Sequence, residues 1–537
     1  MRNGLFLAAT ASLVTLGGCL FSYSSGDYDK DIGWGGGGGD ASTSSSGMGA
    51  MTGSGGAGGP DACHPAFCDA DASTTTCTPN LACPSVAWSA RWGALGQQRV
   101  FAVASDGARV ALAGEYDGQS FEIGEKSPRT LPLASPNFGP EAFVTLLDDK
   151  GSATWASPVA LGIGYQPRSA YAVAFAGKDI VVAGSRASTE GGTPNVDVFI
   201  RKFTPGDNNA VTDVGPPLQF GGDGPDKAVA VAAAATGEFY VAGTISAPGS
   251  KAVSCNMAEY PLKNGMFVVG YDSAGTCKWF AQAEGEVEPT ALVYDGKNLV
   301  SVVGHFKGTL KLPSGNLFTT KTNATDSFVL GLEPSSGVVG SSTQIQADVG
   351  GAVRALAATT SIDGKVYIAG QLKGKTSVEP DRMTDEETAV FVMPVVLENP
   401  WKQVFPGGNV PGLEAAAGTS ITFAADGSLY VGGTFRDVID IDPTSPSGTF
   451  ERAGVNPFLA RIDPVAGALS WFDVYNGRGQ QQFTTSFFVT TLQSDVLLAG
   501  KWITDFSFTK DGSKPLTAKG DGMTDDDIIA AKVTPNP

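Results

Sequence analysis

The sequence is poor in the residues from which most enzymes build active sites. Its 537 residues include only two histidines, His64 and His305. It contains no H-E-x-x-H metal-binding motif, no nucleophile elbow for a catalytic serine, and no glycine-rich loop with the lysine of a P-loop. Its 54 Asp and Glu residues are so numerous that their presence alone does not indicate glycoside cleavage. We therefore predict no catalytic residue from the sequence.

Positive charge is also scarce. The chain has 36 Lys and Arg residues against 54 Asp and Glu residues, which gives a formal net charge of −18. Nucleic acids and anionic membrane surfaces are bound through clustered Lys and Arg, so this balance argues against both as partners of the folded domain. Charge of this size, spread along the chain, is typical of a soluble surface.

Long apolar runs are missing except for one near the N-terminus, from Leu5 to Leu16. This run follows Arg2, is too short to span a membrane, and is typical of a secretory signal. The tetrad LGGC, which ends at Cys19, resembles a bacterial lipobox, in which the Cys becomes the lipidated N-terminus. The resemblance implies that residues 1–18 are a lipoprotein signal peptide and that Cys19 carries acyl groups such as palmitate. The alternative is a simple signal peptide that contains a Cys by chance.

Residues 19–62 are rich in Gly and Ser and have no apolar period, so they cannot bury enough surface to fold. We interpret them as a flexible tether whose ends lie roughly 35 Å apart on average. Together with the lipobox, the tether predicts an exported protein that is anchored by lipid to the bacterial cell envelope, at the outer membrane or the cell surface.

Six cysteines remain after Cys19, and an even number in an exported protein is first interpreted as disulfides. Four lie in residues 63–84, at Cys63, Cys68, Cys77 and Cys83. No C-x-x-C knuckle suggests zinc, so we predict two disulfides here, with three possible connectivities. Cys255 and Cys277 form the third candidate pair; the alternative for them is two unpaired buried thiols.

One pattern occurs seven times between residues 85 and 537. The glycine that ends a V-A-G strand stands at positions 114, 184, 243, 304, 370, 433 and 500, a period of about 63 residues. The repeats also hold a strand centred on Phe and a strand of small residues such as AVAVAAAA (228–235), and four of them hold a strand centred on Trp. Four short alternating segments joined by glycine-rich turns predict one four-stranded propeller blade per repeat. The small-residue strand should be innermost, and the repeated glycine should mark a bend or a close backbone approach.

The two ends of the array complement each other. The last repeat stops after its third strand, IIAAKV (528–533), whereas SVAWSARWG (85–93) is a Trp strand with no repeat before it. Paired with each other, they complete one blade and remove the exposed sheet edge of an open array. The sequence thus predicts an all-β, closed seven-bladed propeller; a solenoid would instead need polar caps at both ends. The second repeat departs most from the pattern, because LQFGG (218–222) stands where a Trp strand is expected.

The repeats resemble a known family, the bacterial secreted β-propeller repeats (SBBP-like). The resemblance is carried by DGSLYVGGTF (426–435), DSFVLGLEPSSG (326–337) and PFLARIDPVAGALSW (457–471), and it covers roughly residues 85–533. It implies the propeller fold and export. It implies no reaction and no catalytic residue, because the matching positions are structural.

Clustered acids are the remaining candidates for a site. DGMTDDD (521–527) and DRMTDEE (381–387) precede the Phe strands of their repeats, but neither has the D-x-D-x-D-G order of a calcium loop. We expect solvated turn acids, with Ca²⁺ binding by Asp525, Asp526 and Asp527 as the alternative and no other cofactor. His305 follows the repeat glycine, where other repeats carry Glu, Ser, Thr, Gln or Lys, so we expect it to face solvent and to bind no ligand.

These observations predict a monomeric, lipid-anchored binding or scaffold module that recognises an envelope protein or a polysaccharide through its loops. Two alternatives stay open: a hydrolase or lyase with carboxylates converging in the central channel, and a purely structural envelope protein. The loops in which the repeats differ are the expected place of recognition.

Overall fold

The computed structural model is all-β in the part of the chain that it describes. It describes residues 84–118, 120–124, 128–132, 140–159, 166–188, 195–207, 210–215, 217–379, 383, 387–395, 400–407, 416–442, 448–477, 487–502, 506–508, 516–517 and 526–535. Within these residues no helix is long and apolar enough to cross a membrane. The candidates Cys19, Cys63, His64, Cys68, Cys77, Cys83 and Asp525 lie outside the described residues.

Each sequence repeat supplies four strands, which pair in antiparallel order from the inside outward. Repeat 1 contains β2 (Gln98–Ser105), β3 (Val110–Tyr116), β6 (Glu141–Leu147) and β7 (Ala153–Pro158). Repeat 2 contains β8 (Gln166–Ala176), β9 (Asp179–Ser188), β10 (Asn195–Pro205) and β12 (Leu218–Phe220). Repeat 3 contains β13 (Lys227–Ala233), β14 (Phe239–Ile245), β17 (Gly265–Tyr271) and the first part of β18 (Cys277–Tyr294).

The second part of β18 begins repeat 4, which continues with β19 (Val300–Leu312), β21 (Thr325–Leu332) and β22 (Val339–Ile345). Repeat 5 contains β23 (Ala352–Thr360), β24 (Val366–Lys373), β25 (Thr388–Pro394) and β26 (Gln403–Pro406). Repeat 6 contains β27 (Ala416–Phe423), β28 (Leu429–Asp440), β29 (Thr449–Ile462) and β30 (Leu469–Val474). Repeat 7 contains β32 (Phe487–Leu492), β33 (Asp495–Trp502), β35 (Asp527–Thr534) and the N-terminal β1 (Ser85–Trp92).

Short additional strands extend the connections between these elements. They are β4 (Phe121–Ile123) with β5 (Arg129–Leu131), β11 (Val211–Asp213) beside β10, β15 (Ala252–Cys255) with β16 (Ala258–Pro261), β20 (Gly315–Thr319) beside β19, and β31 (Asn476–Gly477) with β34 (Phe506–Ser507). Repeat 2 is the irregular member, as its sequence predicts. Its outer strand β12 has three residues, and β10 pairs with both β11 and β12.

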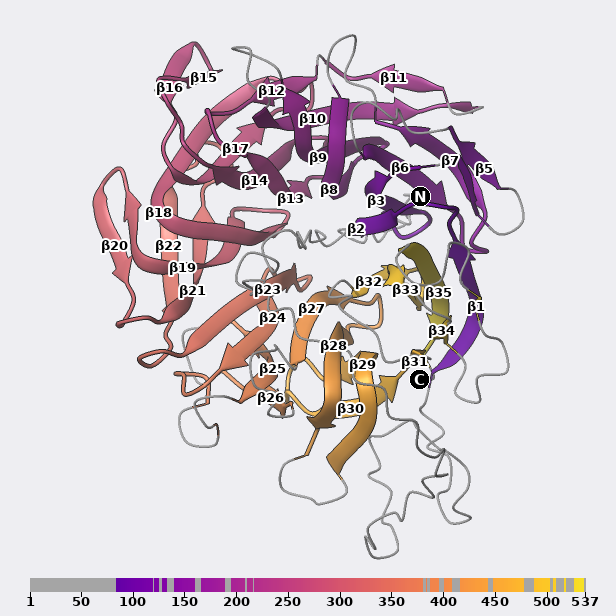
Figure 1. The fold of residues 1–537 in the computed structure, drawn as a ribbon. Coiled ribbons are helices and arrows are strands. Elements are labelled where there is room, and N and C mark those ends of the chain that lie inside the picture. Colours follow the sequence, from indigo (N-terminus) through magenta and orange to yellow (C-terminus); the bar gives the residue numbers. More distant parts are fainter. Residues whose placement is uncertain are drawn as a thin grey trace, which may run out of the picture.

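The repeats are arranged in a propeller-like manner around a common centre (Figure 1). The small-residue strands lie innermost, and each contacts the inner strand of the next repeat; β32 of repeat 7 contacts β2 of repeat 1. The N-terminal strand β1 pairs with β35 from Ser85 opposite Thr534 to Trp92 opposite Ile528, the pairing that the two incomplete ends predict. The core fills the spaces between neighbouring sheets, since each buried apolar cluster combines residues of at least two repeats.

A close backbone approach accounts for the repeated glycine. In repeats 1 to 6 the inner strand is bulged next to this glycine. A Cβ atom on Gly114 would stand 1.8 Å from the carbonyl oxygen of Arg99, and one on Gly370 would stand 2.0 Å from that of Arg354. The bulge brings the backbone of the inner strand against the second strand, so the facing position of the second strand must be glycine, as predicted from the V-A-G pattern.

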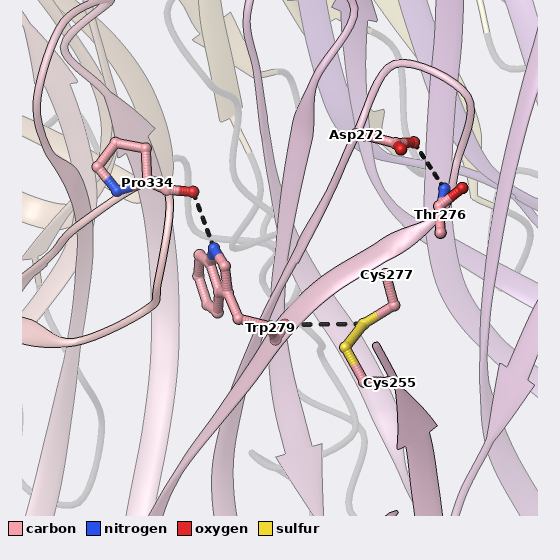
Figure 2. Close-up of a disulfide and its surroundings, with 6 residues drawn as sticks. All are labelled: Cys255, Asp272, Thr276, Cys277, Trp279 and Pro334. Atoms are coloured by element: carbon pink, nitrogen blue, oxygen red, sulfur yellow. Dashed lines mark hydrogen bonds between the residues drawn. A yellow bond between two sulfur atoms is a disulfide. The ribbon is translucent and has the colours of Figure 1, made fainter. Parts of the chain in front are cut away.

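Tryptophans in or next to the outer strand connect four of the repeats with the repeat that follows. The indole nitrogen of Trp279 in repeat 3 donates to the carbonyl oxygen of Pro334 in repeat 4 at 2.8 Å (Figure 2). Equivalent bonds are Trp88 to Asp149 at 3.1 Å, Trp155 to Ala210 at 3.1 Å and Trp401 to Pro464 at 2.9 Å. Every acceptor lies in the turn between the third and fourth strands of the following repeat. Trp471 of repeat 6 has no such acceptor among the described residues, because β35 and β1 of repeat 7 are not joined by a turn.

The two faces of the arrangement differ. On the turn face, tight turns join first to second strands. The links between third and fourth strands lie on the same face and are five or six residues long in repeats 1, 3, 4 and 6, but they are residues 206–217 in repeat 2 and 395–402 in repeat 5. On the opposite face, which we call the connection face, lie the links between second and third strands and those between repeats. The link between second and third strands is residues 189–194 in repeat 2 but residues 503–526 in repeat 7. Variation between repeats is therefore concentrated on the connection face.

Candidate functional site

Two concentric sets of side chains lie at the connection face. The inner set contains the residue that precedes the bulge in each inner strand of repeats 1 to 6. The outer set contains the residue that follows the repeat glycine in each second strand. Cross-strand partners are Arg99 with Glu115, Ser169 with Ser185, Lys227 with Thr244, Glu288 with His305, Arg354 with Gln371, and Ala417 with Thr434; Lys501 continues the outer set in repeat 7. We call these residues the polar rings. Because these pairs have the same register relative to the repeat glycine, they lie at the same height along the strands of each repeat.

The outer ring is buried between neighbouring repeats. Glu115 of repeat 1 accepts a hydrogen bond from Ser169 Oγ of repeat 2 at 2.5 Å, and Gln371 of repeat 5 donates to the carbonyl oxygen of Ala416 at 3.1 Å. Burial raises the pKa of Glu115, while Ser169 and Arg99 lower it. The prediction that this position faces solvent is wrong, because the side chain turns into the space between two sheets.

The prediction that His305 of repeat 4 faces solvent is also wrong. Its side chain is only 15% exposed, and its Nε2 lies 3.3 Å from Oε2 of Glu288 on the neighbouring inner strand. The hydrogen bond from His305 lowers the pKa of Glu288 to about 2, against the opposing effect of burial, with smaller contributions from Lys227 and Arg354. Glu288 thus has His305 as its hydrogen-bond partner and is also influenced by the charges of Lys227 in repeat 3 and Arg354 in repeat 5.

A second network joins the last repeat to the first. Arg99 Nε lies 2.5 Å from Oδ2 of Asp526, and its Nη1 lies 3.2 Å from Oε1 of Glu115. Arg91 Nε lies 2.7 Å from Oδ2 of Asp527, and both of these side chains are at most 1% exposed. The expectation of solvated turn acids is wrong for Asp526 and Asp527, because the ring closes over them. Each is paired with an arginine. Among the described residues, no three or more His, Cys, Asp or Glu side chains are grouped so that they could hold a metal ion.

The polar rings carry an excess of positive charge in an acidic chain. They contain four cationic side chains, Arg99, Lys227, Arg354 and Lys501, and two carboxylates, Glu115 and Glu288. The whole chain has a net charge of −18. Sequence reasoning missed the inner ring, although a cation directly before a small-residue strand, as in RVFAVAS, KAVAVAA and VRALAATT, was the available signal.

Converging carboxylates do not line the described inner strands. In these strands acids occur only at Glu284, Glu286 and Glu288, all in β18. Glu288 is paired with His305, and Oε1 of Glu286 lies 3.6 Å from Nζ of Lys307. Two facing acids from different strands, which glycoside cleavage would require, are therefore not found among the described inner strands.

The Cys255–Cys277 disulfide is present, with a Cα–Cα distance of 5.2 Å. It fastens the tip of the hairpin β15–β16, which is inserted in the link between the second and third strands of repeat 3, to the start of the outer strand β18 at the turn-face end of the sheet (Figure 2). Asn256 and Met257 form the hairpin turn with positive φ angles, and Met257 is fully exposed. A connection that differs from those of the other repeats is thus held in place covalently.

Comparisons with known proteins give similarity at the level of solved structures. No family model and no curated protein matches the chain. The crystal structure of BamB from Moraxella catarrhalis aligns with 67% of this chain and 95% of its own, at 11% sequence identity and a TM-score of 0.29. A TM-score of this size establishes neither a shared function nor a shared site.

Proposed function

We propose that the protein is a lipid-anchored binding module of the bacterial cell envelope, built as a closed seven-bladed β-propeller that recognises a protein or a polysaccharide through its connection face. The cyclic contacts of the inner strands and the pairing of β1 with β35 support the closed ring. The lipobox-like LGGC and the tether support export and anchoring through Cys19. The resemblance to SBBP-like repeats agrees with both.

One observation carries the assignment of the binding surface. The polar rings and the links that differ most in length between repeats lie on the same face, whereas the turn face carries shorter links, the longest of them residues 206–217 in repeat 2. Function in repeat proteins is carried by positions that differ between repeats on a common scaffold. The excess of cations in the rings favours a ligand that presents carboxylates or other acidic groups to this face.

A matched pair of substitutions in repeat 5 tests the assignment. Arg354 begins β23 at the connection face, and Lys365 lies in the turn that follows β23 on the turn face. Arg354→Ala places at this position the residue that repeat 6 carries, Ala417, so the fold should persist. We expect Arg354→Ala to weaken binding in a screen of glycans and envelope proteins, and Lys365→Ala to leave it unchanged. Equal binding by both variants would contradict recognition through the connection face.

Anchoring has a separate test. Cys19→Ala removes the only thiol that the lipobox offers for acylation, so we expect the protein to move from the membrane fraction to the soluble fraction. Continued membrane association of the variant would contradict lipid anchoring through Cys19.

A further inference from the structure

The outer edge of repeat 4 differs from every other outer edge in the structure. Six of the seven outer strands are short or carry a charge or a proline: β12 has three residues, and the others contain Pro158, Lys278, Pro406, Asp473 and Arg91. Such residues are the usual means by which proteins block edge-to-edge pairing. The sequence of β22, VGSSTQI, contains neither charge nor proline.

Two of the other edges are also covered by neighbouring groups. On β7, Arg129 donates from Nε to the carbonyl oxygen of Ala153 at 3.4 Å and from Nη2 to that of Thr154 at 3.3 Å. The outer strand β18 is bonded to the β15–β16 hairpin by the disulfide. The arginine bonds on β7 and the hairpin next to β18 hinder the approach of a further strand to these two edges.

The edge of β22 is open along its middle. Gly340, Ser341 and Ser342 are exposed, and β21 is the only strand with which β22 pairs. From Ser341 to Ile345 the register with β21 is unbroken, so the strand presents regular extended backbone. Gln344 bonds to Thr319 and Asp326 at one end, and Val338, 58% exposed, lies beside the other.

We propose that β22 is a docking edge for an extended peptide segment of a partner protein, which adds to repeat 4 as a fifth strand. An open edge selects its occupant by backbone chemistry, because alternate outward N–H and C=O groups match only another extended chain. The small uncharged side chains Ser341, Ser342 and Thr343 leave room on both sides of that chain, and Val338 offers it an apolar contact. This inference rests on the proposed protein-binding function. It adds that the bound segment of the partner is an extended strand.

The test uses a phage library of linear peptides, each about ten residues long, which is enough to cover a strand of ordinary length. The purified full-length protein is compared with Ser341→Pro and Ser342→Pro. Neighbouring residues of a strand direct their N–H groups to opposite sides, so one of the two substitutions removes an outward donor and leaves the pairing with β21 intact. The variant that keeps the wild-type unfolding midpoint identifies that position and is the one used for binding.

We expect the wild type to enrich extended peptides from the library. The affinity of these peptides for the edge-blocked variant should be more than about tenfold lower than for the wild type, because a few backbone hydrogen bonds are lost. Hydrogen exchange should show slowed amides within 339–345 when such a peptide is bound. Lys365→Ala, a substitution on the turn face, should bind these peptides normally. Peptides lost from Arg354→Ala but kept by the edge-blocked variant would overturn this inference and leave the proposed function standing. No enrichment, or a dimer of the protein alone that the edge variant abolishes, would also overturn it.

Discussion

Replacing Asp527 with alanine would leave the guanidinium of Arg91 in the interior without the carboxylate that lies 2.7 Å from it. Both side chains are at most 1% exposed, and the pair joins the N-terminal strand β1 to the third strand of repeat 7. Removing one partner of a buried ion pair costs about 3–5 kcal/mol, because the remaining charge keeps its desolvation penalty. Bonds from Arg91 to the carbonyl oxygens of Trp502 and Leu516 remain, which places the expected loss nearer to 3 kcal/mol.

Urea unfolding followed by tryptophan fluorescence measures this loss. The matched control is Asp213→Ala, which breaks the pair between Arg201 and an aspartate that is 49% exposed, and it should cost about 1 kcal/mol or less. The double variant Arg91→Met/Asp527→Leu should regain most of the stability, since apolar groups of similar size carry no desolvation penalty. If Asp527→Ala destabilises no more than Asp213→Ala, the closing strand is not coupled to the rest of the ring by this pair.

Three further substitutions have defined outcomes. Trp279→Phe should cost about 1 kcal/mol more than Trp471→Phe in free energy of unfolding, because only Trp279 donates an indole hydrogen bond; equal costs would show that these bonds between repeats add nothing. Cys255→Ser with Cys277→Ser should lower the free energy of unfolding by about 3 kcal/mol relative to the oxidised wild type in urea unfolding, and an unchanged value would show that this disulfide adds no stability. Burial raises the pKa of Asp226 to about 7, so the unfolded chain releases this proton at lower pH than the folded one. Stability should therefore fall as pH rises from about 4 to 7, by roughly 4 kcal/mol, and Asp226→Ala should flatten that slope in pH-dependent unfolding.

The strands and their order could be predicted because they depend on local periodicity that recurs in each repeat. The V-A-G glycine shows this well: a bulge beside it occurs in repeats 1 to 6, and the backbone of Arg99 leaves no space for a Cβ at Gly114. The pairing of β1 with β35 followed from two incomplete ends that complement each other. Both inferences use patterns contained in the sequence itself.

The polar residues could not be predicted in the same way, because their burial depends on the adjacent repeat. His305 and Asp526 stand at positions that look variable and hydrophilic along the chain, yet each is paired with a group from another strand, Glu288 for the first and Arg99 for the second. An alternating pattern tells which side of a sheet a residue lies on. It does not tell whether a neighbouring sheet covers that side.

The position of Ser85 determines how the molecule is presented. Because Ser85 lies opposite Thr534 in the pairing of β1 with β35, the described chain begins and ends at the turn face. Any attachment through the residues that precede Ser85 therefore holds the ring from the side opposite the polar rings and the variable connections. A molecule tethered through these residues would turn the polar rings and the variable connections away from the point of attachment.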